Sequence, residues 1–382
     1  MKKIIFIFFI ILTASFVFSF YFQNEVTLDS DFEILDVFFC PHDYCGKKLI
    51  SFINMANKSL YCAFYDIDDK YIINSIINKS NEIDVSILVD KSNDIEFFKK
   101  IDQNGLMHHK FCLIDDEYVF VGSYNPTING AYKNNNNIII LKGKSAYDEY
   151  YNEFLRLNGL DYKYKSKFIK FNRHIYETLY NKIKSANKSI KIAAFTFTDP
   201  DLADLIIEKH LSGIDVKILL EKRQISKWSQ YERFLKYDIV KKDFNKNNMH
   251  NKFFIIDDKL VITGSYNPTR NAKNRNSENI IIIDDQKYIN DFISEFNFLY
   301  NPNNYGVNYT LLKNKNYILY IDINFNKTII KKIILNDKYN YTRVYFENDF
   351  FLIKNNKNYF DLIDSNNYVI KRISKKEYYE LI

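Results

Sequence analysis

Glycine, proline and cysteine are all scarce in this chain. Of its 382 residues, 9 are glycine, 5 are proline and 4 are cysteine. The first two shortages accompany an abundance of Asn, Lys, Ile and Tyr, which reflects the nucleotide composition of a genome as much as any physical demand, so they exclude no function. A strong charge of one sign is also lacking, because the net charge is only +6. That value falls short of a dedicated nucleic-acid-binding protein, although it permits a polyanionic substrate.

Residues that bind metals are scarce as well. Cys40, His42 and Cys45 are close in sequence, but three ligands without a distant partner pair do not complete a tetrahedral site. We therefore expect neither a metal nor an organic cofactor. Cys40 and Cys45 flank a short segment that could close a disulfide, whereas Cys62 and Cys112 lie within apolar runs and are expected to be plain core residues.

A long uncharged run, residues 4–22, follows the N-terminal Met-Lys-Lys. At about 1.5 Å per residue, it approaches the roughly 30 Å hydrocarbon core of a bilayer. Lysines precede the run and acidic residues follow it, so the positive-inside rule places the remainder outside the cytosol. We expect residues 1–26 to be a signal or membrane anchor, with the catalytic domains outside the cytosol, or secreted if the segment is cleaved.

The body of the chain is duplicated. "ANKSLYCAFYDIDD" at Ala56 matches "ANKSIKIAAFTFTD" at Ala186, and "MHHKFCLIDD" at Met107 matches "MHNKFFIIDD" at Met249. The offset grows from 130 residues (186 − 56) to 142 residues (249 − 107). The second copy therefore contains an insertion near "QISKWSQYERFLKYD", which we expect to form a surface loop or an extra helix over the site.

Each copy alternates apolar strands with helices of 3.6-residue periodicity. This alternation predicts an α/β fold with a mixed sheet flanked by helices in each copy, residues 27–160 and 161–303, packed about a pseudo-twofold axis. A tight turn at Asp115-Asp116 is expected to follow the motif strand. From residue 304 to 382, short apolar runs separated by Asn, Asp and Lys clusters predict a small antiparallel β module that carries no chemical motif.

A set of polar residues keeps fixed spacing in both copies, in the pattern His-x-Lys-x4-Asp-x6-Gly-Ser-x-Asn. Its members are His108, Lys110, Asp115, Gly122, Ser123 and Asn125, and again His250, Lys252, Asp257, Gly264, Ser265 and Asn267. Along a strand, the His and the Lys project from the same face. Two converging copies would place two imidazoles beside two ammonium groups, which suits a phosphate. We assign the His, Lys and Asp as catalytic and the Ser and Asn as phosphate-binding.

With this doubled motif, residues 32–303 resemble the phospholipase D superfamily. The resemblance implies a pair of α/β domains that share one metal-independent phosphodiesterase site. We expect a monomer, because both motifs lie in one chain. It further implies that one His forms a covalent phosphohistidine, while the other protonates the leaving oxygen and then activates water. The resemblance defines the reaction better than it defines the substrate.

Two substrate classes remain open, nucleic acid and phospholipid. The compact copies resemble the small nuclease and mitochondrial-type branch, so we favour an endonuclease acting on DNA or RNA; an N-terminal anchor would instead favour a phospholipid hydrolase or phosphatidyltransferase at a membrane. A basic, aromatic groove would indicate nucleic acid. The residues that suggest one are Lys222, Arg223, Trp228, Tyr231, Arg233, Arg270, Lys273 and Arg275. A catalytically inactive binding module would have lost a motif His or Lys, and neither copy has.

The two copies differ at one informative position. The second copy reads "NSEN" where the first reads "NNNN", so that Glu278 aligns with Asn136. In the superfamily this position faces the His of the opposite half, which would place Glu278 against His108 and Asn136 against His250. A carboxylate stabilises the imidazolium that forms on phosphorylation. The resemblance therefore implies that His108 is the nucleophile and His250 the general acid and base.

Overall fold

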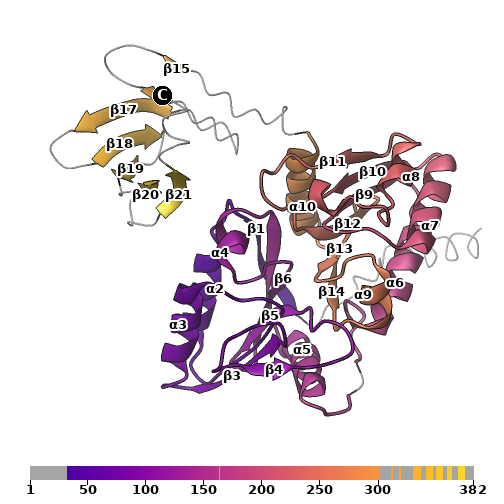
Figure 1. The fold of residues 1–382 in the computed structure, drawn as a ribbon, viewed down its shortest axis with the longest axis horizontal. Coiled ribbons are helices and arrows are strands. Elements are labelled where there is room, and N and C mark those ends of the chain that lie inside the picture. Colours follow the sequence, from indigo (N-terminus) through magenta and orange to yellow (C-terminus); the bar gives the residue numbers. More distant parts are fainter. Residues whose placement is uncertain are drawn as a thin grey trace, which may run out of the picture.

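The structure is a computed structural model. It describes residues 32–162 and 164–301, together with the backbone of short strands between residues 311 and 374. The two sequence copies form two halves of similar architecture (Figure 1).

The first half forms a seven-stranded sheet in the order β1-β7-β6-β5-β2-β3-β4. Within it, β2 pairs in parallel with β3, and β3 with β4, whereas the remaining pairs are antiparallel. Its elements are β1 (Glu33–Cys40), α2 (Cys45–Met55), β2 (Ser59–Phe64), α3 (Lys70–Lys79), β3 (Asp84–Asp90), β4 (Lys99–Ile101), β5 (Lys110–Ile114), β6 (Tyr118–Gly122), α4 (Ile128–Tyr132), β7 (Asn136–Lys142) and α5 (Lys144–Leu157).

The second half repeats this arrangement, with the sheet order β11-β10-β9-β12-β13-β14-β8. Read from its other edge, the order matches the first sheet strand for strand, which confirms the prediction of two mixed α/β halves. Its elements are β8 (Ile169–Phe171), α6 (Arg173–Lys184), β9 (Ser189–Ala194), α7 (Pro200–Leu211), β10 (Asp215–Leu220), η1 (Lys222–Gln224), α8 (Tyr231–Leu235), β11 (Val240–Lys242), β12 (Lys252–Ile256), β13 (Leu260–Gly264), α9 (Arg270–Asn274), β14 (Asn279–Ile283) and α10 (Gln286–Tyr300).

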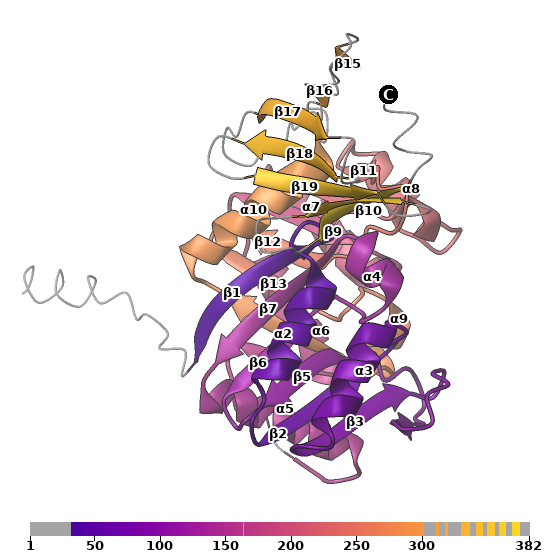
Figure 2. The same cartoon turned by 90° about the vertical axis from the view of Figure 1, so that its left-hand side faces the viewer.

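Apolar side chains fill three layers. Both sheets contribute one face to a central core that also contains α5 and α10, including Tyr150, Phe154, Phe292 and Phe296. The outer face of the first sheet packs against α2 and α3, and that of the second against α6 and α7. Figure 2 looks directly onto α2 and α3. The central strands β5 and β12 are buried along their whole length, as expected of strands covered on both faces.

Local sequence explains where the helices at the site end of each sheet begin. Asp69 caps α3, because its carboxylate accepts a hydrogen bond of 2.9 Å from the Tyr71 amide. Asp199 caps α7 in the same way, at 3.0 Å from the amides of both Asp201 and Leu202, and Pro200 occupies the first turn. Short acceptor side chains at the N-cap and proline just inside it are both favoured at helix starts.

The motif aspartates form the turns of two hairpins. Asp115 and Asp116 have φ of 57° and 60°, and Asp257 and Asp258 have φ of 56° and 54°, as in the turns that suit tight hairpins. The Asp115 carboxylate accepts hydrogen bonds from the amides of residues 57–59 at 2.8–3.1 Å. Asp257 binds the amides of residues 187–189 at 2.7–3.1 Å. Each carboxylate thus fastens a hairpin to the start of the neighbouring strand.

The assignment of Asp115 and Asp257 as catalytic is therefore corrected. Each lies five positions along its strand from the motif Lys, which corresponds to about 16 Å at a rise of about 3.3 Å per residue. Three backbone amides already occupy each carboxylate. The motif spacing places an Asp at each hairpin turn because its carboxylate accepts these backbone hydrogen bonds. Neither Asp115 nor Asp257 reaches the motif His and Lys.

The cysteines form two disulfides in the described part of the chain. Cys40 and Cys45 are bonded as expected, which also excludes their thiolates as metal ligands. Cys62 and Cys112 are bonded as well, so the expectation that they are plain core residues is wrong. They are 50 residues apart in sequence but lie directly opposite each other where β2 pairs with β5, a proximity that only the strand pairing creates.

The insertion in the second copy forms η1 and α8, as the extra-helix alternative predicted. It is anchored to the segment just after β9, where the Gln230 amide donates to the Phe197 carbonyl at 3.0 Å and Thr196 donates to the Gln224 side chain at 3.3 Å. The C-terminal antiparallel module is also present, since β17 (Ile330–Asn336), β18 (Tyr341–Phe346), β19 (Phe350–Asn355), β20 (Tyr359–Ile363) and β21 (Val369–Ser374) form one antiparallel sheet. A separate pair joins β15 (Leu311–Leu312) and β16 (Ile318–Leu319).

The predicted location of the protein at or beyond a membrane is not supported. No helix in the part of the chain that the structure describes is long and apolar enough to cross a bilayer. Residues 4–22, on which the prediction rested, lie outside the described residues. The localisation is therefore withdrawn.

We predict that Asp115→Ala and Asp257→Ala each lower the free energy of unfolding by about 2 kcal/mol, since charge-assisted hydrogen bonds are lost. The turnover number of the folded protein should stay within about twofold. Burial raises the pKa of Asp115, but hydrogen bonds from Lys58, Asn57 and Ser59 outweigh it and lower the pKa overall. The stabilisation is thus present above the unfolded-state pKa and is lost as the pH falls through the folded-state pKa. Thermal unfolding at pH 7 and at pH 3 measures both effects; a large loss of turnover at unchanged stability would contradict this role.

Candidate active site

Each motif histidine is held by a backbone segment of the opposite half. The His108 amide donates to the Ser277 carbonyl at 2.9 Å, and the His250 amide donates to the Asn135 carbonyl at 2.8 Å. The same segments form isolated parallel bridges, Met107 with Ser277 and Asn135 with Met249. The two contacts are related by the pseudo-twofold, so both histidines lie at the interface between the halves.

The side-chain partners also cross the interface. His108 Nδ1 lies 2.8 Å from Glu278 Oε2, and His250 Nδ1 lies 2.8 Å from Asn136 Oδ1 and 3.1 Å from the Ser123 carbonyl oxygen. The expected placement of Glu278 and Asn136 is confirmed. Because the neighbours of each Nδ1 are oxygen acceptors, Nδ1 carries the hydrogen and Nε2 of each ring is left for a substrate.

The motif lysines lie beside these rings. Lys110 Nζ donates to the His108 carbonyl at 2.6 Å, and Lys252 Nζ donates to the His250 carbonyl at 2.7 Å. An aromatic ring flanks each pair. Lys110 Nζ lies 5.0 Å from the centre of the Tyr65 ring, and Lys252 Nζ lies 5.1 Å from that of Phe195. Both lysines are fully buried, so little water competes for their charges.

Burial and mutual repulsion control the protonation of the site. Burial, followed by the charges of Lys110 and Lys252, holds the pKa of His108 well below its usual value. Burial and the same two lysines lower the pKa of His250. Burial lowers the pKa of Lys110 to about 7, against the opposing attraction of Glu278. Since lysines from both halves act on each imidazole, the two motifs form one electrostatic unit, and an anion placed among these groups would favour their charged forms.

Burial raises the pKa of Glu278 to about 7, and the Lys110 charge opposes the rise. The lowered pKa of His108 and the raised pKa of Glu278 both disfavour a full ion pair between the two side chains. The Asn136 amide cannot ionise, so His250 has no equivalent. The site is therefore symmetric in geometry but not in charge.

The predicted phosphate-binding residues divide into two groups. Ser265 donates its only hydroxyl hydrogen to Glu278 Oε2 at 2.5 Å, so its assignment to a phosphate is corrected. Ser123 accepts from the Asn137 amide at 3.0 Å and is fully buried, which gives it a structural role as well. Asn125 and Asn267 have buried Oδ1 atoms with no hydrogen-bond partner in the described residues. These oxygens accept and do not suit a phosphate, so only the Nδ2–H groups of the two side chains stay candidates for binding one.

The motif glycines allow a close approach between strands. A Cβ atom at Gly122 would lie 2.1 Å from the Asn137 carbonyl oxygen, and one at Gly264 would lie 2.3 Å from that of Asn279. Only glycine permits this contact. It brings Ser123 and Ser265 beneath the strands that carry Asn136 and Glu278.

The comparisons with known proteins agree with this geometry. A family model described as "Cardiolipin synthase, PLD-like domain" matches residues 91–158 and 179–300, and each matched segment contains one copy of the motif. The chain belongs to the phospholipase D superfamily.

Three individual proteins illustrate the relationship. The mitochondrial cardiolipin hydrolase of Chlamydomonas reinhardtii is 36% identical over 118 residues, which are 30% of this chain and 53% of that protein. The phospholipase D of Rickettsia conorii is 37% identical over 122 residues, 30% of this chain and 59% of that protein. The chain thus spans a little over half the length of these curated relatives. The phosphatidylserine synthase structure from Haemophilus influenzae shares the fold, with a TM-score of 0.54 and 12% identity over 70% of this chain and 88% of that one.

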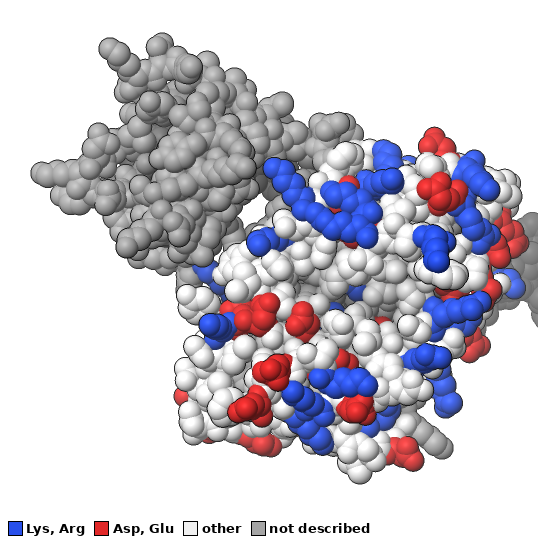
Figure 3. Space-filling model, viewed as in Figure 1, with Lys and Arg blue, Asp and Glu red and all other residues white. Residues whose placement is uncertain are grey.

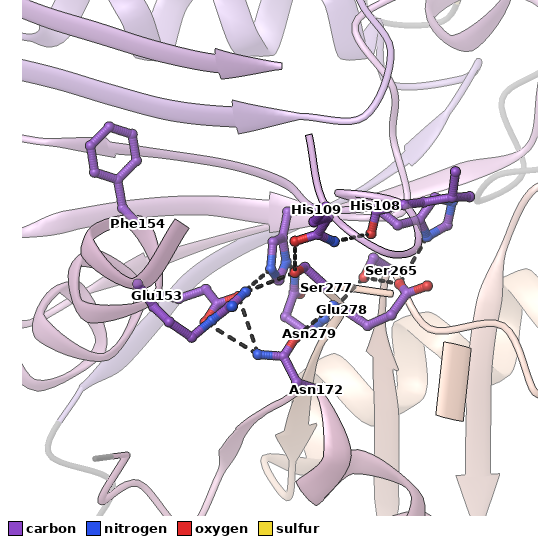
Figure 4. A network of polar contacts seen from close by, with 12 residues as sticks. His108, His109, Glu153, Phe154, Asn172, Ser265, Ser277, Glu278 and Asn279 are labelled. Atoms are coloured by element: carbon purple, nitrogen blue, oxygen red, sulfur yellow. Dashed lines mark hydrogen bonds and ion pairs between the residues drawn. The ribbon is translucent and has the colours of Figure 1, made fainter. Parts of the chain in front are cut away.

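Sequence reasoning overlooked a second set of buried polar residues in this phospholipase D-like site. His109 Nε2 lies 2.6 Å from Glu153 Oε1, and Arg156 and Asn172 also bind Glu153 (Figure 4). The sequence held one signal, because His109 in "MHHK" is replaced by Asn251 in "MHNK". The alignment of Glu153 with Glu295 gave no indication of what either residue contacts.

Several residues expected to line a groove are engaged elsewhere. Tyr231 is buried, Arg233 pairs with Asp204, and Lys273 pairs with Asp201. Trp228 remains open, with 70% of its surface exposed. As for metal ligands, no cluster of three or more His, Cys, Asp or Glu side chains suited to an ion occurs among residues 32–162 and 164–301.

We predict that His108→Ala and His250→Ala each reduce hydrolysis of bis(p-nitrophenyl) phosphate by at least about 10³-fold, because both imidazoles serve one site and removal of one disables the other. The double variant should be no less active than either single variant. Steady-state kinetics with matched circular dichroism spectra measures this. Retention of about half of the activity in each single variant would show two independent sites.

Proposed function

We propose that this chain hydrolyses phosphodiester bonds without a metal ion, through a covalent phosphohistidine, and that its substrate is nucleic acid. The single observation that supports the chemistry is the crossed pairing of His108 with Glu278 and of His250 with Asn136. These pairings occupy both Nδ1 atoms. The Nε2 atoms of His108 and of His250 are left for a substrate, beside the buried Lys110 and Lys252.

In the first step, His108 Nε2 attacks phosphorus and the bond from phosphorus to the leaving oxygen breaks. His250, in its imidazolium form, transfers its Nε2 proton to that oxygen. The phosphorylated His108 ring carries a positive charge, which the Glu278 carboxylate stabilises through Nδ1–H. Lys110 and Lys252 neutralise the non-bridging oxygens throughout.

In the second step, water attacks phosphorus and gives a proton to His250 Nε2, and the bond between phosphorus and His108 breaks. The enzyme returns to its starting state with one P–O bond exchanged for another, so no outside reactant besides water is needed. An amide suits His250 better than a carboxylate would, because an acid must also give its proton away, and a carboxylate would hold it.

A basic segment beside His250 supports nucleic acid as the substrate. We call residues 222–248 the basic lip. They carry eight Lys or Arg and three Asp or Glu, an excess of five in a chain whose total excess is six. The matching segment of the first half, residues 91–106, carries three of each. Figure 3 shows Lys and Arg gathered over the part of the second half that contains β10, β11 and α8.

Exposed aromatic rings accompany these charges. Trp228 is 70% exposed and Phe244 is 62% exposed, and Lys227 Nζ lies 5.0 Å from the centre of the Trp228 ring. The lip also contacts the first half beside the site, since Asn245 Nδ2 donates to Asn135 Oδ1 at 2.6 Å. Rings for base stacking and cations for phosphates are the usual combination for single-stranded nucleic acid.

Phospholipid is the second candidate, because the names of the matched relatives refer to cardiolipin hydrolase and phospholipase D. The same aromatic and basic residues would also suit an anionic lipid surface. The excess of charge beside the site, in an otherwise nearly neutral protein, favours the polyanionic strand. The two substrates are distinguished by direct assay.

The full chain in excess EDTA should cleave labelled single-stranded DNA or RNA faster than it hydrolyses cardiolipin in vesicles. Lys227→Glu combined with Trp228→Ala should raise KM for an oligonucleotide about tenfold and leave hydrolysis of bis(p-nitrophenyl) phosphate unchanged. Lys184→Glu is the matched control, because it also reverses one lysine charge. Lys184 is the last residue of α6 and precedes the start of β9, whereas His250 is near the other end of that strand, where Lys252 pairs with Ala194. Turnover of vesicles alone would refute the nucleic-acid substrate, and strict dependence on added Mg²⁺ or Zn²⁺ would refute the mechanism.

We predict further that His250→Asn accumulates a covalent adduct on His108, because an amide neither activates water nor releases the intermediate. Mass spectrometry of tryptic peptides after an acid-free quench should find the phosphoryl group on the peptide that contains His108. An adduct on His250 in the His108→Asn variant would reverse the two roles.

A further inference from the structure

The strongest unexplained feature is a buried carboxylate behind the catalytic pair. Glu153, on α5, is fully buried. Arg156 donates to both of its oxygens at 2.8 Å, and His109 lies 2.6 Å away. Asn172 donates at 3.3 Å and Tyr164 donates as well. Burial opposes ionisation, but the hydrogen bonds from Arg156 and His109 lower the pKa of Glu153 to about 2, so it stays charged.

Three of these partners each hold one residue of the segment that carries Glu278. Arg156 donates to the Ser277 hydroxyl at 2.7 Å. The Glu278 backbone amide donates to Asn172 Oδ1 at 3.0 Å. His109 Nδ1 accepts from the Asn279 amide group at 2.9 Å. Figure 4 shows Glu153, His109 and Asn172 next to the segment that carries Ser277, Glu278 and Asn279.

Asn279, at the end of this segment, is connected through Ser265 to the Glu278 carboxylate. The Asn279 backbone amide donates to Ser265 at 3.0 Å, and Ser265 donates to Glu278 Oε2 at 2.5 Å. That oxygen is the one that faces His108 Nδ1. A continuous set of hydrogen bonds therefore runs from Glu153 to the face of Glu278 that meets His108.

The second half keeps the scaffold and one equivalent contact, from Asn137 Nδ2 to Asn251 Oδ1 at 3.0 Å, but it replaces the His and the Arg of this network. The positions that match His109, Glu153 and Arg156 are Asn251, Glu295 and Phe298. Burial raises the pKa of Glu295 to about 8, so burial favours the protonated form of this carboxyl. Glu153, whose two oxygens accept several hydrogen bonds, thus lies on the side of Glu278. Its counterpart Glu295, whose Oε1 has no hydrogen-bond partner among the described residues, lies on the side of Asn136.

We propose that Glu153 is a positioning residue, which through Arg156, Asn172 and His109 fixes Glu278 in the orientation that His108 needs. A carboxylate must be held more rigidly than an amide here, because Glu278 stabilises a charge that exists only while His108 is phosphorylated. This inference rests on the proposed chemistry, and it adds a residue that touches neither the substrate nor the motif His and Lys.

A double-mutant cycle on Glu153 and Glu278 tests it, with bis(p-nitrophenyl) phosphate as the substrate. Glu153→Gln should lower kcat about tenfold and leave KM within about twofold, because a displaced Glu278 affects the transition state and not binding. In a Glu278→Gln background, the same substitution should cost less than about twofold in kcat, since its effect passes through Glu278. Equal losses of kcat in both backgrounds would overturn the proposal.

Two further variants keep the test decisive. Glu295→Gln is the matched control in the second half and should leave kcat unchanged, because a carboxyl whose protonated form is favoured is replaced by an amide of the same shape. If Glu153→Gln does not fold, His109→Asn reproduces the residue of the other half and should show the same dependence on Glu278. A wild-type protein without hydrolysis, or an unaffected Glu278→Gln variant, would instead refute the proposed function.

Discussion

Each motif histidine of this protein is completed by the half of the chain to which it does not belong. Glu278 orients His108 and Asn136 orients His250. The residues before these two partners, Ser277 and Asn135, form bridges with the residues before the two histidines, Met107 and Met249. Two imidazoles and two ammonium groups could not be buried together within one half, because their desolvation and repulsion would be uncompensated. Closure of the interface supplies the acceptors, so formation of the fold and formation of the site are the same event.

A duplicated scaffold would by default give two identical histidines. Here one substitution, Glu278 against Asn136, changes the charge on one side while the distances to Nδ1 remain 2.8 Å on both. Geometry and electrostatics are thereby separated: the twofold arrangement brings the rings together, and the single carboxylate makes them unequal. The network behind Glu278 follows the same asymmetry, since hydrogen bonds lower the pKa of Glu153 and burial raises the pKa of Glu295.

The superfamily motif contains residues with two kinds of task. The His and Lys face the shared site, whereas the Asp closes a hairpin and the Gly permits a close contact between strands. Both kinds keep their spacing equally well, because a strand that is displaced by one residue would turn every motif side chain to the wrong face. Fixed spacing therefore identifies the constraint without revealing whether it is chemical or structural.

The sequence by itself determined the duplication, the α/β class, the repeated histidines and lysines, and the alignment of Glu278 with Asn136, because these follow from periodicity and from comparison of one copy with the other. The resemblance to the superfamily, and not the spacing, implied that the two motifs share one site and that Glu278 faces His108. Only the tertiary structure decided that Asp115 binds backbone amides, that Cys62 bonds to Cys112, and that the partners of Glu153 contact the segment that carries Glu278. Each of these contacts joins segments far apart in the chain, and their proximity depends on strand order and on how the halves pack. Local sequence patterns carry no information about such distances, since the same spacing is compatible with any partner that the fold brings near.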